Sequence, residues 1–496
     1  MNVILIYPEF PDTFWSFKHA LEFIRKKSSS PPLGLLTIAA MLPKEWNIRL
    51  IDVNVQKLTR KDLRWADYAF ISAMTVQRYS AHTIIDQCKE FGIKVVAGGP
   101  LFIYEYEDFK NVDHFILNEA EITLPLFLRD LEQHSAERIY QSTEFADLEY
   151  TPIPDWKLVN MKQYASMNVQ YSRGCPFNCD FCNITALFGH KPRIKSTEKM
   201  IAELDGLYNA GWHGSIFFVD DNFIGNKKVL KEELLPALIQ WKKDKKGIVF
   251  NTEVSINIAD DQELMALMVA AGFTKVFIGI ETTDENSLVE CNKKHNLNRD
   301  LLENVKLLHR SGLQVQGGFI VGFDHDTPLT FQKIFNFIQQ SGIVTAMVGI
   351  LQAPPGTKLF DRMSRSGRID HMMSGDNVDG STNLVTKMDV DILKTEYSGL
   401  LNHLYSPEQY YRRVKTFLQE YKLPKVKWNM NFQFITENLM AFLRSIIKLG
   451  IFSKERLYYW KLFFWTLFHK PRSFAQAITF SIYGYHFRKI CELHVV

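Results

Sequence analysis

The chain contains two series in which short apolar runs alternate with helical patterns, and this alternation restricts its fold more than any other feature. The first series occupies residues 1–135. Amphipathic stretches separate its strands, which is typical of a mostly parallel, doubly wound α/β sheet. The predicted strands are Val3–Tyr7, Ile48–Val53, Tyr68–Ala73, Ile93–Ala97 and His114–Leu117. Ligands of such sheets bind at the carboxyl ends of the strands, so the turns there are the first candidate sites.

The second series follows a connector at residues 136–165, which carries Pro152 and Pro154. Six strands are predicted: Asn168–Ser172, Ser215–Val219, Val249–Ser255, Lys275–Glu281, Gln314–Val321 and Val344–Ile350. This number of units over residues 166–385 fits a partial (β/α)6 barrel, although periodicity alone fits a second open sheet nearly as well. Strand signals fade from residue 386, and a helical C-terminal region is expected over 386–496.

Composition describes an ordinary globular protein. The 496 residues suggest about three domains, and the contents of 46% hydrophobic and 23% charged residues exclude wholesale disorder, a collagen-like chain and a coiled-coil rod. The net charge of +3 gives no reason to expect a nucleic-acid partner. Because the N-terminus lacks the pattern of a signal peptide and no long uncharged apolar run occurs, we predict a cytoplasmic protein.

Three of the six cysteines lie in one short segment, YSRGCPFNCDFCNIT. Cys175, Cys179 and Cys182 follow the first strand of the second series, and three thiolates on one loop can bind three irons of a cubane cluster while the fourth iron stays open. These three residues are therefore the predicted catalytic and metal-ligating residues. A zinc site with His190 as the fourth ligand, or unrelated free cysteines, are the alternatives. Six cysteines are too few for a disulfide scaffold.

The spacing Cys-x3-Cys-x-aromatic-Cys, with Phe181 as the aromatic residue, resembles that of the radical S-adenosylmethionine (SAM) enzymes. The resemblance implies a [4Fe-4S] cluster whose open iron chelates SAM. An electron from the cluster would then cleave SAM to a 5′-deoxyadenosyl radical, which abstracts a substrate hydrogen. It also implies an external electron donor of the flavodoxin or ferredoxin type.

Further segments agree with this resemblance and supply candidate SAM-binding residues. FFVDDNF ends the second strand where the family often carries a Gly-Gly-Glu-like element, and GGFIVGF resembles the family's element beside the adenine. For each carboxylate, helix capping or a solvated loop is the alternative role. The candidates are Asp220, Asp221, Glu281, Gly318 and Gly322, with Glu253 and Ser255 as weaker ones.

A doubly wound, Rossmann-like domain ahead of a radical SAM barrel resembles the cobalamin-binding subclass. The usual signature of that subclass, Asp-x-His-x-x-Gly, here has Asn54 for the histidine and Lys57 for the glycine, so no histidine ligand to cobalt is expected. Glycines at strand ends would let a corrin or nucleotide tail approach the backbone, although a simple tight turn or an empty domain are alternatives. The candidate cobalamin-binding residues are Pro8, Asn54, Ser72, Thr75, Gly98, Gly99, Pro100 and Glu119.

Over nearly its whole length the chain resembles the group that contains the hopanoid C-methylases. The resemblance rests on YPEFPDTFWSFKHAL, PPLGLLTIAA, AGGPLF, QYSRGCPFNCDFC, FFVDDNFIGNKK and GYHFRK. It implies methyl transfer through methylcobalamin to an unactivated carbon of a hydrophobic, lipid-like or isoprenoid-like small molecule. Relatives that act without methyl transfer leave cyclisation, carbon–carbon bond formation or rearrangement as the alternative.

Residues 438–496 combine nine Lys or Arg with two acidic residues, interleaved with aromatics. Such a composition suits an amphipathic helix lying in a membrane interface. We therefore expect this region to make peripheral contact with the inner face of the membrane. The alternative is a helix pair that packs its aromatics against the barrel and leaves its basic face in water.

Overall fold

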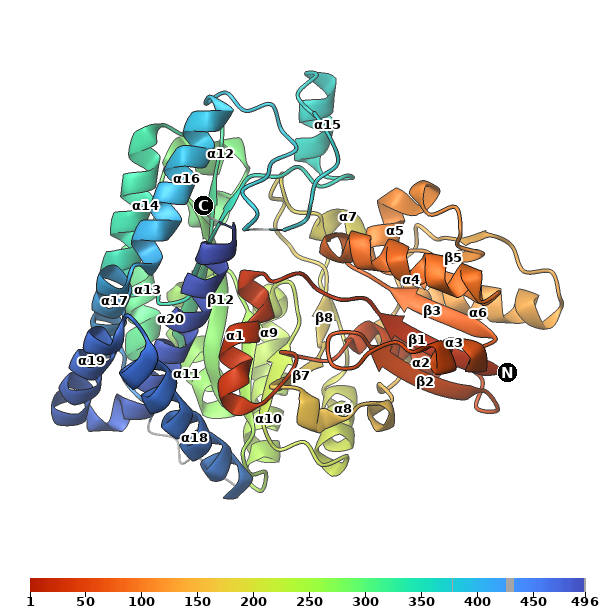
Figure 1. The fold of residues 1–496 in the computed structure, drawn as a ribbon, viewed down its shortest axis with the longest axis horizontal. Helices are drawn as coiled ribbons and strands as arrows, with labels where there is room; N and C mark the ends of the chain where they lie inside the picture. Colours follow the sequence, from red (N-terminus) through yellow and green to blue (C-terminus); the bar gives the residue numbers. More distant parts are fainter. Residues whose placement is uncertain (377, 425–431, 495–496) are drawn as a thin grey trace.

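The computed structural model describes residues 1–376, 378–424 and 432–494, and it begins with a six-stranded parallel sheet in the order β2-β1-β3-β4-β5-β6 (Figure 1). The strands are β1 (Asn2–Tyr7), β2 (Asn47–Asp52), β3 (Tyr68–Ser72), β4 (Lys94–Gly98), β5 (His114–Ile116) and β6 (Ile139–Tyr140). The connecting helices are α2 (Leu33–Met41), α3 (Arg60–Trp65), α4 (Arg78–Glu90), α5 (Pro100–Glu105) and α6 (Ala120–Glu132). The strand order turns back at β1, as a doubly wound sheet requires.

Alternate residues of these strands bury against different helices. Val3 and Leu5 of β1 join the core that contains α2 and α6, whereas Ile4 and Ile6 join the core that contains α4 and α5. Both faces of the sheet are therefore covered, which explains why its strands read as continuous apolar runs. The sheet extends to Tyr140 because β6 pairs with β5, so it enters the stretch that we expected to be a connector.

The second sheet is also parallel and has the order β14-β13-β12-β11-β10-β7. Its strands are β7 (Ser166–Val169), β10 (Ser215–Phe218), β11 (Val249–Glu253), β12 (Phe273–Glu281), β13 (Gln314–Val321) and β14 (Ala346–Ile350). Its helices include α8 (Thr197–Asn209), α9 (Lys227–Val229), α10 (Leu235–Lys242), α11 (Gln262–Ala271), α12 (Glu285–Glu290), α13 (Leu301–Ser311) and α14 (Pro328–Ser341). Because neighbouring strands follow one another in sequence, right-handed crossovers place the helices on one face, and the sheet forms a partial barrel rather than a second doubly wound layer.

A small antiparallel ribbon stands at the first strand of this barrel. Strands β8 (Ser172–Arg173) and β9 (Arg193–Ile194) pair with each other, and the segment between them carries the three clustered cysteines and helix α7 (Ile184–Phe188). The predicted strand Asn168–Ser172 is therefore divided, since β7 ends at Val169 and β8 begins at Ser172. The ribbon fixes both ends of the cysteine segment.

The C-terminal region is helical, as expected. It contains α15 (Lys358–Arg365), α16 (Val390–Tyr405), α17 (Pro407–Glu420), α18 (Phe432–Ser445), α19 (Arg456–His469) and α20 (Phe474–His494). Helix α17 packs on α14, while α16 packs on both α14 and α20. Residues 425–431 and 495–496 of the expected cap lie outside the described residues. In the part of the chain that the structure describes, none of the helices is long and apolar enough to cross a bilayer.

The first helical segment after β1 leaves its own domain and packs against the C-terminal end of the chain. Helix α1 (Lys18–Leu21) lies beside α20, and the 3-10 turn Glu22–Ile24 packs on α18 (Figure 1). The ring of Phe14 lies 5.2 Å from that of Phe487. These contacts join the N-terminal domain to the C-terminal helices.

Candidate functional site

A cavity of about 1160 Å³ lies between the two sheets. One wall is formed by residues at the carboxyl ends of β1, β3 and β4, including Tyr7, Ser72 and Gly98. The opposite wall is the interior of the partial barrel, with side chains from β7 to β14. Helices α2, α18 and α20 also contribute residues. The cavity thus joins the two places where α/β folds bind ligands.

Several predicted cobalamin-binding residues meet at this cavity. Ser72, Gly98, Gly99 and Pro100 line it. Gly99 has φ +93, and a Cβ there would lie 2.7 Å from the Ser72 hydroxyl oxygen, so only glycine fits this turn at the start of α5. The backbone is therefore exposed to the cavity where a bulky planar ligand would approach. Pro8 and Thr75 do not contribute to its lining, although their neighbours do.

Asn54 lines the cavity, but its own loop uses its amide. The Oδ1 atom accepts a hydrogen bond from the Phe10 N–H at 2.8 Å, and Nδ2 donates to the Pro8 carbonyl at 3.1 Å and to Asp52 Oδ1 at 2.7 Å. The buried Asp52 also accepts a hydrogen bond from the Tyr164 hydroxyl at 2.9 Å. Asn54 therefore stabilises the loop that follows β2. Unlike a histidine, it has no imidazole that could bind a cobalt ion.

The cysteine segment is shaped by its own backbone. Gly174 has φ +91, and a Cβ there would lie 2.9 Å from the Gly189 carbonyl oxygen. The Cys175 N–H donates to the same carbonyl at 3.3 Å, and the Cys182 N–H donates to the Cys179 carbonyl at 3.2 Å. The three thiols are half-buried and influence one another electrostatically. Three thiol donors on one short loop have the donor chemistry of an iron–sulfur cluster.

Lys293 lies beside these thiols and was not identified from the sequence. Burial raises the pKa of the Cys179 thiol to about 11 and that of Cys182 to about 12, and the ammonium of Lys293 acts in the opposite direction on both. Its Nζ atom lies 2.6 Å from Oε1 of the buried Glu281. Burial lowers the pKa of Lys293, but the charges of Glu281 and Cys179 raise it by more. The net pKa lies above the usual value for lysine, so the ammonium stays charged. A fixed cation of this kind favours the thiolate form of the nearby cysteines.

Two predicted SAM-binding carboxylates face the cavity from neighbouring strands. Burial raises the pKa of Asp221 to about 6, and burial together with the nearby Asp221 raises that of Glu253 to about 8. Oδ2 of Asp221 is buried and has no hydrogen-bond partner. A cationic ligand group would satisfy these carboxyls and restore their charge, and the ammonium of SAM is such a group.

Other predicted SAM contacts have structural partners instead. Asp220 is fully buried and accepts hydrogen bonds from the Ser172 hydroxyl and the Tyr171 N–H, so it holds the β7–β8 junction and does not reach the cavity. Ser255 bonds to Asn222 and Asn257. Asn222, which the sequence did not reveal, also approaches the Cys175 sulfur at 4.0 Å.

The remaining candidates of the barrel lie close to the cysteine segment or in turns. Glu281 pairs with Lys293, and Phe181 lies with its ring 5.8 Å from the Lys293 ammonium. Gly318 leaves room for the ring of Phe277, and Gly322, at φ +99, donates its N–H to Asp326 at 2.8 Å. None of these four predicted residues, Phe181, Glu281, Gly318 and Gly322, lines the cavity.

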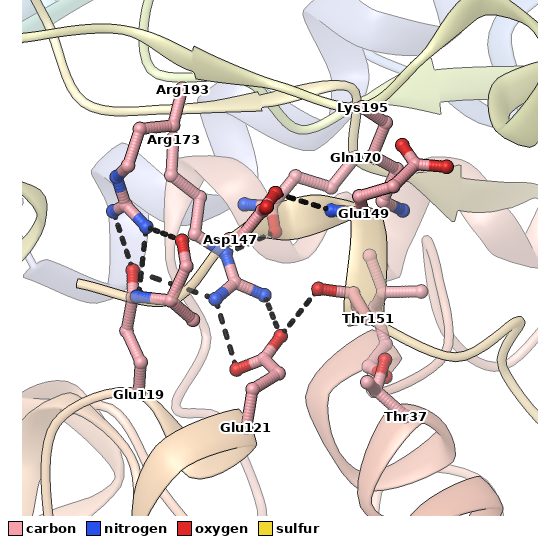
Figure 2. A network of polar contacts seen from close by, with 12 residues as sticks. Thr37, Glu119, Glu121, Asp147, Glu149, Thr151, Gln170, Arg173, Arg193 and Lys195 are labelled. Atoms are coloured by element: carbon pink, nitrogen blue, oxygen red, sulfur yellow. Dashed lines mark hydrogen bonds and ion pairs between the residues drawn. The ribbon is translucent and has the colours of Figure 1, made fainter.

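A network of ion pairs joins the N-terminal domain to the cysteine segment (Figure 2). Glu121, in the first turn of α6, pairs with Arg173 of β8 at 2.7 Å. Glu119, expected to contact cobalamin, lines the cavity, but its carboxylate pairs with Arg193 of β9 at 2.6 Å and lies 3.5 Å from Arg173. Its side chain therefore serves the domain junction rather than a ligand. The two arginines flank the segment that carries the cysteines.

Comparison with known families gives a match on each part of the chain. Residues 25–128 match the B12 binding domain, residues 169–338 the Radical SAM superfamily, and residues 357–495 a domain of unknown function (DUF4070). The first two matches lie on the doubly wound sheet and on the partial barrel. They support the iron–sulfur interpretation of the cysteines rather than the zinc site that the sequence left open.

Solved structures show the same overall fold. The cobalamin-dependent S-adenosylmethionine radical enzyme OxsB, with aqua-cobalamin bound, superposes with a TM-score of 0.64 at 15% identity over 99% of this chain and 79% of its own. The radical S-adenosylmethionine methyltransferase TsrM from Kitasatospora setae gives a TM-score of 0.61 at 14% identity over 99% of both chains.

Curated relatives match across nearly the full chain. An uncharacterised methyltransferase of Synechocystis is 39% identical over 99% of this chain and 92% of its own length. The hopanoid C-2 methylase of Rhodopseudomonas palustris is 32% identical over 93% of this chain and 88% of its own. The protein therefore belongs to the cobalamin-dependent radical SAM methylase family, whose enzymes use a [4Fe-4S] cluster, SAM and cobalamin.

Proposed function

We propose that this enzyme methylates an unactivated carbon of a hydrophobic, lipid-like substrate. The observation that carries the proposal is the single cavity that reaches from the strand ends of the cobalamin domain into the barrel. Trp15, Phe217, Phe277 and Met347 give it apolar walls large enough for a hydrocarbon skeleton. The relative named for a lipid substrate, the hopanoid C-2 methylase, supports the same class.

Each group of residues has a proposed role in this reaction. When bound, the cluster and SAM would supply a hydrogen-abstracting radical, and cobalamin would supply the methyl group. Cys175, Cys179 and Cys182 would hold the cluster, while Asp221 and Glu253 would orient the ammonium of SAM. The backbone at Ser72 and Gly98–Pro100 would support the corrin. Radical SAM enzymes require a reductant, and we propose a flavodoxin or a ferredoxin for this role.

Anaerobic turnover with a lipid extract and deuterated SAM tests the proposal. A lipid that gains a deuterated methyl group, together with 5′-deoxyadenosine, is the expected result by mass spectrometry. Cys179→Ala should abolish both products, whereas Cys88→Ala, which removes a buried thiol of α4, should keep them. Formation of 5′-deoxyadenosine with a modified lipid that carries no deuterium would instead favour cyclisation, carbon–carbon bond formation or rearrangement.

We also propose that the enzyme reaches its substrate at the inner face of a membrane, through an exposed apolar surface on α18, on the π-helical segment Ile446–Phe452 that continues it, and on α19. Leu443, Ile447 and Ile451 form one stripe at helical spacing, and their exposures are 44%, 52% and 53%. Phe452 and Phe468 are still more exposed, at 77% and 75%. Exposed apolar side chains in such a row support contact with a bilayer.

Basic residues border this surface. Lys454, Arg456, Lys461 and Arg472 are exposed, and none of them forms an ion pair within the described residues. Cations beside an apolar stripe complement the headgroups of anionic lipids. Many aromatic side chains of the region, including Tyr459 and Phe480, are buried in the protein. These residues follow the alternative expectation, in which the aromatics pack inward instead of facing a membrane.

Flotation with liposomes tests the membrane contact. The full-length protein should float with phosphatidylglycerol-containing vesicles and should lose this property when Ile447, Ile451 and Phe452 are replaced together by serine. Leu329→Ser, which removes an exposed leucine from α14 on the barrel, is the matched control and should float like the wild type. Equal flotation of the triple variant and the wild type would contradict the proposal.

A further inference from the structure

The deep end of the cavity, toward the amino ends of the barrel strands, is polar. Asn168 of β7, Asn251 of β11 and Lys275 of β12 line it at one level of the barrel. Gln316 of β13 also lines the cavity, two residues further along the strands and level with Phe277. Asn251 and Lys275 are register partners on neighbouring strands, so their side chains lie on the same face at the same level. We call these four residues the barrel floor. Barrel interiors are usually packed with branched apolar side chains, so a purely hydrocarbon ligand would not require such a floor.

Most of the barrel floor lies nearer the amino ends of the strands than the proposed SAM carboxylates. Glu253 is two residues beyond Asn251 along β11, which corresponds to about 7 Å of strand. Asn251 and Lys275 are therefore separated from Glu253 along the strands, whereas Gln316 is level with Glu253 but two strands away, and all of them belong to the same cavity. A ligand long enough to reach both would place one end on the floor and a carbon of its skeleton near the cofactor sites.

Several polar atoms of the floor have no partner in the described part of the chain. Asn168 Oδ1 is buried without a hydrogen bond. Asn251 accepts a hydrogen bond from the Ser215 hydroxyl at 2.9 Å, but its amide hydrogens and the whole amide of Gln316 have no hydrogen bond. Enclosed polar groups without partners are costly, so a ligand or water must satisfy them.

Lys275 gives the floor its charge. Its Nζ lies 3.3 Å from the hydroxyl of Tyr483 of α20, and no carboxylate pairs with it in the described residues. Of the other cavity cations, Arg173 pairs with Glu121, Lys195 with Glu203 and Lys18 with Asp12, while Lys27 donates to the Val55 carbonyl at 2.9 Å on the side of the N-terminal domain. An ammonium with amide donors beside it is suited to an oxyanion.

We infer that the substrate is an amphiphile whose acidic end group, a carboxylate or a phosphate, binds on the barrel floor through Lys275, Asn251 and Gln316. The inference rests on the proposed function and narrows its substrate class. The ring of Phe277, two residues beyond Lys275 along β12, would then hold the hydrocarbon part between the floor and the cofactors. Lys275 would act as a specificity-determining residue and would take no part in the radical chemistry.

Binding of two matched isoprenoids to the reconstituted holoenzyme tests this inference. Geranylgeranoic acid and geranylgeraniol have the same chain and differ in the charge of the end group. By calorimetry at pH 8, the acid should bind at least about tenfold more tightly than the alcohol. Lys275→Met should remove this preference without weakening the alcohol, and Lys275→Arg should retain it. Lys306→Met, on the outer helix α13, is the control and should bind like the wild type.

Equal affinity for the acid and the alcohol, binding of neither, or an equal loss of both in Lys275→Met would overturn the inference. A second measurement analyses the lipid product of the turnover with deuterated SAM. The labelled lipid should be retained on an anion exchanger. Labelled lipid found only in the neutral fraction would contradict an acidic end group. Failure of methyl transfer itself is distinguishable, because it leaves no labelled lipid in any fraction while the binding preference persists.

Discussion

Asn54 occupies the position at which the Asp-x-His-x-x-Gly signature of the cobalamin-binding subclass carries its histidine. Its amide forms hydrogen bonds with Phe10, Pro8 and Asp52. We predict that the cob(II)alamin form of the enzyme shows no nitrogen superhyperfine splitting in its electron paramagnetic resonance spectrum, because the loop at residue 54 would offer an asparagine, already hydrogen-bonded within the loop, in place of a ligating imidazole. Addition of free imidazole to the same sample should produce the splitting and is the control. Splitting without imidazole would contradict the prediction.

Glu253 allows a pH prediction on the cofactor-free protein. Burial and the neighbouring Asp221 raise its pKa to about 8, so the folded protein holds a proton that the unfolded chain releases at lower pH. A raised carboxyl pKa lowers stability as pH rises toward the folded value. Relative to the wild type, Glu253→Gln should therefore gain about 2 kcal/mol of unfolding free energy between pH 6 and pH 8.

Urea denaturation at the two pH values measures this difference. Glu263→Gln replaces an exposed glutamate at the start of α11 and should follow the wild type at both. A constant difference between Glu253→Gln and the wild type would show that Glu253 ionises with an ordinary pKa in the folded protein.

Among the elements, the β8–β9 ribbon couples the cysteine segment to helix α6. Burial alone would raise the pKa of Glu121, but Arg173 lowers it to about 2. Glu121→Gln leaves Arg173 with a weaker partner in a buried place and should cost about 3 kcal/mol at pH 7. Since a depressed carboxyl pKa stabilises above the unfolded value, the difference from the wild type should shrink as pH falls from about 5 toward 2.

Hydrogen exchange can localise this effect. In Glu121→Gln, protection should fall most in the cysteine segment at residues 174–189, because Arg173 precedes it directly. Glu303→Gln breaks an exposed pair with Arg310 and should change neither stability nor protection there. Uniform loss of protection over both sheets would show that the pair has no special connection with the cysteine segment.

The elements with a strong pattern were predictable, and those that depend on tertiary contacts were not. The eleven predicted strands all have counterparts in the two sheets, because strands of buried parallel sheets are rich in apolar residues. Strands β6 (Ile139–Tyr140) and β9 (Arg193–Ile194) were missed because two residues show no periodicity. Strand order, which distinguishes the partial barrel from an open sheet, is a tertiary property, and local periodicity does not contain it.

The same distinction holds at the site. Cys175, Cys179 and Cys182 lie within one loop, so their spacing and its resemblance to the radical SAM motif predict them as cluster ligands from the sequence. Lys293 and Lys275 come from separate parts of the chain, and only the fold brings them to the cysteines and to the barrel floor. Glu119 and Asp220 were attractive as strand-end acids, but nearby arginines and backbone N–H groups use their carboxylates.

At the scale of the whole molecule, the cobalamin domain and the barrel share buried contacts beyond the cavity. Tyr164, in the connector just before β7, donates to Asp52 at the end of β2, and Phe14 packs against Phe487 of α20. Arg444 of α18 donates to the Phe23 carbonyl at 2.6 Å. These contacts link the first and last thirds of the chain, so the parts should lose their structure together.

We predict that saturating hydroxocobalamin raises the midpoint of one calorimetric transition for the whole chain. A ligand at about a thousand times its Kd stabilises the folded state by about 4 kcal/mol, and in a cooperative molecule every part shares this gain. Phe487→Ala removes the ring that packs on Phe14 and should separate the transition into two, of which only the one for the N-terminal domain responds to cobalamin. Trp212→Phe, a conservative change near the start of β10, should keep one transition. Two transitions in the wild type, with cobalamin shifting only one, would mean that the domains fold as independent units joined by the connector.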